Sequence, residues 1–308
     1  MAAKKVGIIG LGDIAQKAYL PVLAAHSGVE IGGVMSRSAE TVERVGRSLR
    51  VAGRYTSLDR LLGEQELDAV FVHSPTETHY EIVMRCLQAG VPVYVDKPLS
   101  YDIGESEEMA ACALETGKLL AVGFNRRFAP LYAEAKAWME AAGGFRLCTA
   151  EKHRTRQQKH GAKQTLYDDL IHMMDLVLWL SGEAEPAAHY RQQTDAEGRL
   201  LWAAGTLALS SGQGEATFSM VRSAGMDLER LELHGGGRSA RVVNLEQGVF
   251  AEAGGAARET GFGSWEPISL RRGFTGAVEH FLGSLSDPAV CSISADKVLP
   301  VHRLIERL

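Results

Sequence analysis

The chain has 308 residues, of which 45% are hydrophobic and 23% are charged, and its formal net charge is -5 at pH 7. This length suits two globular domains, and the acidic balance gives no reason to expect binding to nucleic acid or to an anionic membrane surface. Four widely spaced cysteines form no C-x-x-C motif and no apolar run approaches a membrane span, so we expect free thiols in a cytoplasmic protein.

The first predicted strand, residues 6–9, runs into a glycine turn whose sequence GLGDIA matches G-x-G-x-x-A, and a helical pattern follows. Strand, glycine turn and helix in this order predict a dinucleotide-binding unit, with a turn that binds no ligand as the alternative. Gly10 permits the tight turn, Gly12 lets the backbone approach a pyrophosphate, and Ala15 lets the helix pack close to the strand.

The first turn of that helix is the expected phosphate site. Its free N–H groups and its positive dipole end are suited to bind phosphates, so Asp13 and Ile14 join the candidate cofactor-binding residues.

Strands and helices then alternate up to residue 123. We predict strands at 29–35, 69–73, 91–95 and 118–123, and helices at 41–49, 58–62, 78–89 and 103–116. The alternation predicts a doubly wound parallel sheet, an α/β Rossmann domain over residues 1–123. Ligands of such sheets bind at the carboxyl ends of the strands, so the residues after each strand are candidates.

Ser36 and Arg37 follow the second strand, and no acidic residue stands beside them to bind the ribose hydroxyls of NAD. The Arg37 guanidinium suits the 2′-phosphate of NADP, so we expect NADP rather than NAD, with a solvated loop arginine as the alternative. Ser74 and Pro75 end a later strand beside the predicted cofactor groove. His79 falls in the following helical turn, either near the cofactor or as a cap residue.

Asp96-Lys97-Pro98 follows the strand at 91–95. A lysine fixed there between a carboxylate and a proline, whose peptide bond can be cis, can stabilise an alkoxide and hydrogen-bond a reacting hydroxyl. The alternative is a loop salt bridge between Asp96 and Lys97.

The glycine turn together with Asp96-Lys97-Pro98 resembles the Gfo/Idh/MocA oxidoreductases, which carry Glu-Lys-Pro at the second position. Residues 71–75 and 125–132 are similar to the branch labelled MviM-like, or virulence factor. The resemblance covers nearly the whole chain. It implies NAD or NADP as cofactor and sugars, inositols or related polyols as substrates, and it places Asn125 and Arg126 beside the nicotinamide or the substrate.

A second domain of α+β type is predicted over residues 124–308. A helix at 129–142 precedes strand-like runs at 145–152, 187–193, 200–210, 215–222, 227–234 and 239–245, and helices follow at 275–285 and 295–308. Short turns such as 211–214 and 235–237 join several of the strands, which predicts a mainly antiparallel sheet. The resemblance implies an open sheet whose exposed face forms a homo-oligomer, a dimer or a tetramer.

The segment 166–180 is apolar almost all round, which predicts a buried helix. Asp168, His172 and Asp175 share one face of it, and buried polar groups must be paired or functional. His172 can shuttle a proton while Asp168 orients its ring; the alternative is a hydrogen-bonded core histidine. One histidine without a second ligand motif is a poor metal site, so no metal is expected.

The resemblance supports this interpretation, because the second motif of the family has an aspartate and a histidine four residues apart. Those positions map onto Asp168 and His172, while Leu170 replaces the glycine usually found between them. Asp169 could take the place of Asp168 in contacting the substrate. The basic segment 153–160 is either a solvated loop or a lid with cationic contacts to an acidic or phosphorylated sugar.

The combined prediction is an NAD(P)-dependent oxidoreductase that acts on a sugar-like alcohol or ketone. Lys97, His172 and Asp168 would be catalytic, and Arg126 and Asp169 would help to bind the substrate. A cleft between residues 1–123 and the rest would be lined by Gly12, Lys97 and His172. Two alternatives are an enzyme that retains NAD for transient oxidation during elimination or glycoside cleavage, and a non-catalytic dinucleotide-binding regulator.

Overall fold

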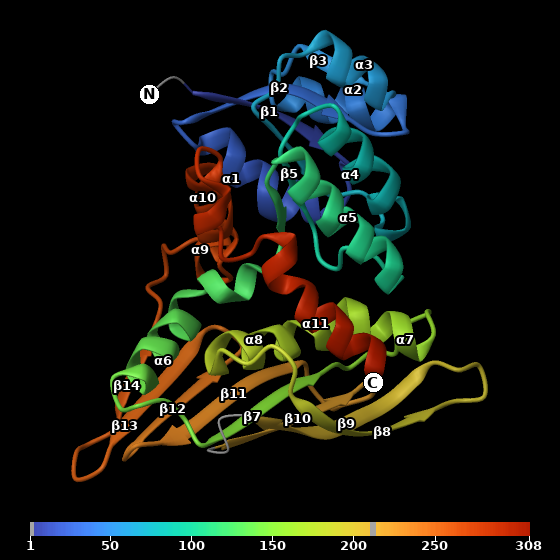
Figure 1. Ribbon diagram of the computed structural model, residues 1–308. Helices are drawn as coiled ribbons and strands as arrows, with labels where there is room; N and C mark the ends of the chain where they lie inside the picture. Colours follow the sequence, from blue (N-terminus) through green and yellow to red (C-terminus); the bar gives the residue numbers. More distant parts are fainter. Residues whose placement is uncertain (1–2, 210–213) are drawn as a thin grey trace. The chain divides into compact units, whose positions relative to one another are not determined.

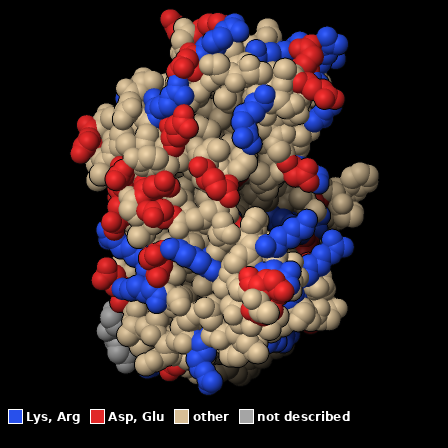
Figure 2. Space-filling view, turned by 90° about the vertical axis from the view of Figure 1, so that its right-hand side faces the viewer, with Lys and Arg blue, Asp and Glu red and all other residues tan. Residues whose placement is uncertain are grey.

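The computed structural model describes residues 3–209 and 214–308. The chain forms two compact units: unit 1 comprises residues 1–124 and 274–299, and unit 2 comprises residues 125–273 and 300–308. Within the described ranges no helix has the length and apolar character needed to cross a membrane. Acidic and basic side chains are interspersed over the face shown in Figure 2.

Unit 1 contains a six-stranded sheet with the order β3-β2-β1-β4-β5-β6, in which all paired neighbours are parallel. This is the doubly wound order of a Rossmann sheet, so that prediction is confirmed. The three-residue strand β3 was not predicted, because it is too short to show a hydrophobic period. The strands are β1 (Lys4–Ile9), β2 (Val29–Met35), β3 (Gly53–Tyr55), β4 (Ala69–Val72), β5 (Val93–Val95) and β6 (Leu120–Val122).

Two of the longer helices of unit 1, α2 and α5, begin where a side chain accepts from a free N–H group. The Ser38 hydroxyl accepts from Thr41 N at 3.2 Å, and Asp102 accepts from Glu105 N at 3.0 Å, so both act as N-caps. The helical segments are η1 (Ala15–Tyr19, a π-helix), α1 (Leu20–Ala25), α2 (Ala39–Ser48), α3 (Leu58–Glu64), η2 (Thr76–Thr78), α4 (His79–Gln88), α5 (Ile103–Thr116), α10 (Phe274–Ser284) and η5 (Pro288–Val290).

The segment 274–299 belongs to unit 1, whereas the predicted division placed it in a second domain at 124–308. In α10 the Phe281 ring lies 5.3 Å from Phe71 and 5.5 Å from Tyr94, centroid to centroid. Farther along, Val122 N donates to Ile293 O at 2.9 Å. The apolar sheet needs cover on its face, and this distant part of the chain supplies it.

Unit 2 contains an eight-stranded sheet with the order β14-β13-β12-β11-β7-β10-β9-β8, drawn in the lower part of Figure 1. β7 and β10 pair in parallel and the other neighbours are antiparallel, so the predicted mainly antiparallel sheet is confirmed. The predicted strand end at Ser210 and most of the turn 211–214 lie outside the described residues. The strands are β7 (Leu147–His153), β8 (Ala187–Thr194), β9 (Leu200–Leu209), β10 (Gly214–Val221), β11 (Leu228–Gly235), β12 (Arg238–Val243), β13 (Gln247–Glu252) and β14 (Arg258–Gly261).

One face of this sheet is covered by helices, of which α6 and α8 lie along it in Figure 1. The residues of α8 are buried except for the half-buried Trp179 and Ser181, which confirms the predicted buried helix. The helical segments are η3 (Asn125–Phe128), α6 (Pro130–Glu140), α7 (Ala162–Thr165), η4 (Leu166–Leu170, a π-helix), α8 (Ile171–Ser181), α9 (Ile268–Arg271) and the end of α11 (Ala295–Arg307).

We predict that Phe281→Ala destabilises the protein by about 3 kcal/mol, because it removes a fully buried ring from the core of unit 1. Urea denaturation measures the free energy of unfolding. Val290→Ala is the matched control, since Val290 lies in the same segment with 57% of its surface exposed. Equal, small effects of both changes would show that α10 is dispensable for unit 1.

Candidate functional site

In unit 1 the glycine turn follows β1, at the carboxyl ends of the parallel strands. Gly10 has φ +86°, and a Cβ there would lie 2.4 Å from the backbone nitrogen of Ser74. At Gly12 no described heavy atom lies within 4 Å of a Cβ position. The turn is therefore closed on one side and open on the other, and these residues fit a dinucleotide whose pyrophosphate must approach the backbone.

The residues around the turn have distinct local roles. Asp13 is exposed and its carboxylate pairs with Lys17 Nζ at 2.6 Å. After β2, Ser36 N donates to Tyr55 O at 3.2 Å, which fixes the loop, and Arg37 is exposed. These positions leave the Arg37 guanidinium accessible to an anion.

The loop after β5 is held through Asp96. His73 Nδ1 lies 2.9 Å from Asp96 Oδ2, and the His73 ring stacks on Tyr19 with centroids 4.1 Å apart. Burial alone would raise the pKa of Asp96, but the nearby His73 outweighs it, and the pKa falls below its ordinary value. The next peptide bond, Lys97–Pro98, is cis.

His79 connects the loops after β4 and β5. It is buried, with Nδ1 2.9 Å from Pro98 O and Nε2 3.0 Å from Ser74 O. Burial lowers its pKa, which favours the neutral ring. Both ring nitrogens therefore lie against protein carbonyl groups, and the side chain braces the two loops beside the glycine turn.

In unit 2 charged side chains occupy positions where the pattern of the sheet is apolar. Cys148 and Ala150 point into the core from β7, and Lys152 follows in the same alternation. Its direct cross-strand partner is Glu229 on β11. Arg222 comes immediately after β10 and is also buried. Because side chains alternate along a strand, these charges all face the inner side of the sheet.

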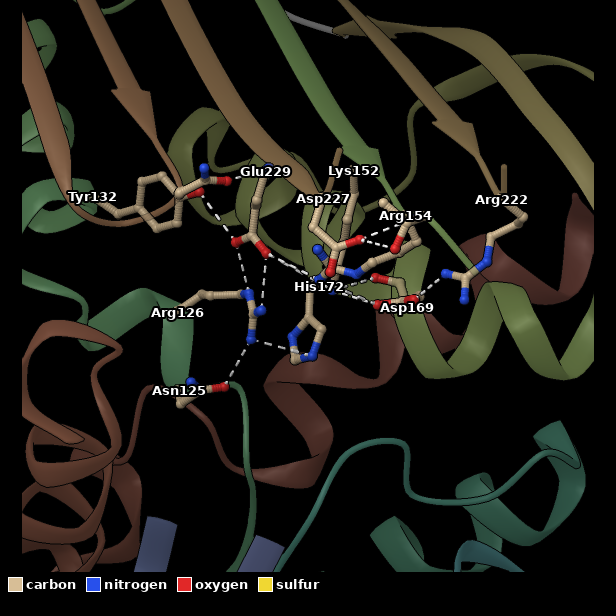
Figure 3. Close-up of polar contacts among 12 residues, drawn as sticks. Asn125, Arg126, Tyr132, Lys152, Arg154, Asp169, His172, Arg222, Asp227 and Glu229 are labelled. Atoms are coloured by element: carbon tan, nitrogen blue, oxygen red, sulfur yellow. Dashed lines mark hydrogen bonds and ion pairs between the residues drawn. The ribbon is translucent and has the colours of Figure 1, made fainter. Parts of the chain in front are cut away.

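These charges form a cluster with residues of the covering helices, shown in Figure 3. Lys152 Nζ lies 2.8 Å from Asp169 Oδ1 and 3.8 Å from Glu229 Oε2. Arg126 donates from Nε and Nη2 to the Glu229 carboxylate at 2.8 and 2.9 Å. Arg222 pairs with Asp169. We name this set the charged cluster: Arg126, Lys152, Arg154, Asp169, Arg222 and Glu229.

The cluster shifts the proton affinity of its members. Burial, with help from Arg126, lowers the pKa of Lys152 to about 7 against the opposing effect of Asp169 and Glu229. Burial would raise the pKa of Glu229, but Arg126 and Lys152 outweigh it and lower it to about 2. The pKa of Asp169 is likewise lowered, chiefly by Lys152, against burial. Both carboxylates are therefore ionised at neutral pH.

Arg126 also connects the cluster to two predicted site residues. Its Nη1 lies 3.3 Å from His172 Nε2 and 3.3 Å from Asn125 Oδ1. An arginine can only donate, so Nε2 of a neutral His172 accepts in this contact. The Asn125 amide in turn donates to Arg272 O at 2.7 Å. Unit 2 thus brings together Asn125, Arg126 and His172.

The polar stripe predicted on the helix at 166–180 is divided between separate partners. Asp175 is buried and receives hydrogen bonds from Arg127 Nε at 2.9 Å and Nη2 at 2.5 Å, an internal ion pair. Asp169 joins the charged cluster from the π-helix η4, whose last residue Leu170 is fully buried. That Asp168 orients His172 stays a prediction.

A pocket of about 470 Å³ lies within unit 2 beside the cluster. It is lined by Arg126, Arg154, Asp227, Glu229, Asn244, Leu245, Glu246 and Arg272. Sequence reasoning had named Arg126 and the basic loop containing Arg154. It missed Lys152, Arg222 and Glu229, although each stands as a charge in the apolar phase of a predicted strand, which is the signal that could have found them.

We predict that Lys152→Met changes the pH dependence of stability. Because the pKa of Lys152 is lowered in the folded state, the folded protein binds fewer protons than the unfolded chain between about pH 7 and about pH 10. This group's contribution to stability therefore rises with pH in that window, by up to about 1.4 kcal/mol per pH unit, and the variant lacks the rise.

The free energy of unfolding, measured by urea denaturation across that window, checks this. Lys163→Met is the control, since its ammonium is exposed and pairs with Glu306 at the surface. A slope in Lys152→Met equal to that of the unmodified protein would contradict the lowered pKa.

Comparisons with known proteins cover both units. Residues 4–124 match the GFO_IDH_MocA oxidoreductase family with an NAD-binding Rossmann fold, and residues 130–253 match the YceM-like C-terminal domain. The chain is 35% identical to YceM of Salmonella typhimurium over 100% of its own length and 98% of that protein. It is 26% identical over 258 residues to inositol 2-dehydrogenase 4 of Saccharopolyspora erythraea, covering 82% and 73% of the two chains.

Among solved structures, the dehydrogenase MviM from Clostridium difficile has a TM-score of 0.91 and 32% identity, covering 99% of this chain and 98% of that one. Both units are thus matched by relatives that extend over nearly the full length. The chain belongs to the Gfo/Idh/MocA family of NAD(P)-dependent oxidoreductases.

Proposed function

We propose that this chain is an NADP-dependent oxidoreductase that transfers hydride to or from a sugar- or polyol-like alcohol or ketone. The observation that carries the proposal is the open backbone at Gly12 after β1 in a chain of this family, with only β4 between β1 and β5, the strand that Lys97 follows. The named inositol dehydrogenase among its relatives supports the substrate class.

The proposed cofactor residues, apart from Asn125, lie in unit 1. The turn from Gly10 to Ala15 would bind the pyrophosphate, Ser36 and Arg37 the 2′-phosphate, and Ser74 and Pro75 the adjoining part of the groove. His79 and Asp96 would act indirectly, by holding the loops. Bound NADP supplies the hydride acceptor or donor. Asn125 is proposed to contact the nicotinamide side.

The proposed proton chemistry belongs to Lys97 and His172. Lys97 polarises the substrate oxygen through its charge and an N–H donor. His172 takes the hydroxyl proton at Nε2 during oxidation and returns it during reduction; its contact with Arg126 at 3.3 Å is long for a charge-assisted bond, so a substrate hydroxyl can replace it. Asp168 positions the ring, while Arg126 and Asp169 help to bind the substrate.

We further propose a cytoplasmic homo-oligomer, a dimer or a tetramer, formed through the exposed face of the sheet in unit 2. The four cysteines are free and buried, which supports a reducing compartment. Buried residues alternate with exposed or half-buried ones along β10 to β13, so one face of these strands is partly open to solvent, which supports the choice of surface.

We predict that the unmodified protein binds NADP more tightly than NAD, and that Arg37→Asp reverses this preference. The introduced carboxylate repels the 2′-phosphate and can accept hydrogen bonds from ribose hydroxyls. Calorimetric titration with both cofactors measures the ratio. Tighter binding of NAD by the unmodified protein would refute the NADP assignment.

We predict that Lys97→Met leaves NADP binding nearly unchanged and lowers kcat. The expected loss of transition-state stabilisation is about 2–4 kcal/mol. His172→Asn should also slow turnover and remove one limb of the pH–rate profile. Nicotinamide absorbance follows the reaction with a panel of sugars and polyols. Normal turnover of Lys97→Met would exclude a catalytic role of this lysine, and turnover without net absorbance change would favour an enzyme that retains its cofactor.

A further inference from the structure

We infer that the charged cluster and the pocket beside it bind an oxyanion of the substrate, a carboxylate or a phosphate group carried by the sugar-like molecule. The inference rests on the proposed function for the sugar-like scaffold. The anionic group itself is argued from unit 2.

The first argument is the balance of charge within the cluster. Four basic side chains, Arg126, Lys152, Arg154 and Arg222, share the carboxylates of Asp169 and Glu229. With every group ionised, these six residues carry an excess of two positive charges, or of one when the neighbouring Asp227, whose pKa Arg154 and Arg222 help to lower, is included. Buried charge without a partner is costly, because water no longer solvates it, so an anion that entered here would be strongly stabilised.

The second argument is that both oxygens of each carboxylate in the cluster already bind a donor. Glu229 receives both hydrogen bonds of a bidentate pair from Arg126, and Tyr132 Oη donates to it at 3.2 Å. Asp169 receives hydrogen bonds from Lys152 and Arg222. The remaining basic group, Arg154, therefore finds no carboxylate oxygen at hydrogen-bond distance in the cluster.

Arg154 carries the argument furthest. Its Nη2 lies 3.8 Å from Asp169 Oδ1 and 4.0 Å from Glu229 Oε2, both beyond a hydrogen bond. Its backbone is fixed by bonds to Val221 and Ala224 at 2.9 and 3.0 Å. A guanidinium on a fixed backbone, in the lining of a pocket, has a planar fork of donors that matches a carboxylate or phosphate.

The acidic residues that line the pocket are held by other partners. Glu246 accepts from Arg271 Nη1 at 2.5 Å. Asp227 Oδ1 accepts from the backbone nitrogen and the hydroxyl of Thr155 at 2.8 and 3.1 Å. Arg272, which also lines the pocket, adds a further exposed cation. About 470 Å³ is within the range of small-molecule sites, so a monosaccharide acid has room.

The test is calorimetric titration of the full chain, with and without NADP, using D-glucuronate, D-glucose 6-phosphate, inorganic phosphate and D-glucose. We expect D-glucuronate or D-glucose 6-phosphate to bind tenfold or more tightly than D-glucose, with an affinity that falls as salt is added. Comparing glucuronate with glucose 6-phosphate identifies the oxyanion that fits.

Arg154→Gln should remove the preference for the anionic sugar over D-glucose. Arg154→Lys should restore part of this preference, because lysine keeps the positive charge but lacks the planar fork of donors. Arg307→Gln, an exposed arginine of the same unit, is the control and should keep the preference. Circular dichroism of each variant verifies that it is folded.

The inference is overturned if D-glucose binds as tightly as D-glucuronate and D-glucose 6-phosphate, or if no anion binds. It is also overturned if Arg154→Gln keeps the preference for the anionic sugar over D-glucose. The NADP titration is a separate readout of the proposed function. Loss of NADP binding with anion binding intact would reject the oxidoreductase role and leave the anion site standing. The reverse result would leave the oxidoreductase role and reject the anion site.

Discussion

The burial of the Lys152 ammonium on the inner face of a sheet is the constraint that organises unit 2. An ammonium there requires carboxylates at close range, and they come from two elements: Glu229 lies directly opposite on β11, and Asp169 is supplied by the π-helix η4. Each carboxylate binds an arginine in turn, Arg126 on η3 and Arg222 after β10. One buried charge thereby fixes the positions of two helical segments over the sheet.

In unit 1 the candidate site depends on the backbone rather than on a cluster of buried ion pairs. Its glycine turn needs backbone close to backbone, and Gly10 meets the loop after β4 at a distance that excludes any side chain. Two histidines then stiffen the neighbouring loops, His73 through Asp96 and His79 through two carbonyl groups. The candidate dinucleotide site is therefore built largely from backbone, whereas the cluster of unit 2 is built from ions.

Much of the fold could be predicted because its signals are local. The glycine turn, the alternation of strands with helices and the apolar helix at 166–180 each lie within a short window of sequence. The position of 274–299 could not, since its rings pack against residues about two hundred positions away and no local period records that. For the site, Lys97 and His172 were named from motifs, while Lys152 and Glu229 become partners only through the register of β7 and β11. The π-helix η4 also escapes a helical-wheel argument, because its hydrogen bonds are i→i+5 rather than i→i+4, and Asp169 within it reaches Lys152 of the sheet.

The chain leaves unit 1 after Phe124 and re-enters it at Phe274, and the residues just inside unit 2 are in contact at this junction. A Cβ on Gly273, where φ is +79°, would lie 2.1 Å from Asn125 O, so only glycine allows the two backbones to meet. The 149 residues from Asn125 to Gly273 therefore behave in topology as an insertion whose ends coincide. Excising them and closing the gap with a short linker would yield a contiguous nucleotide-binding module that keeps α10, something that cutting the gene at residue 124 would destroy.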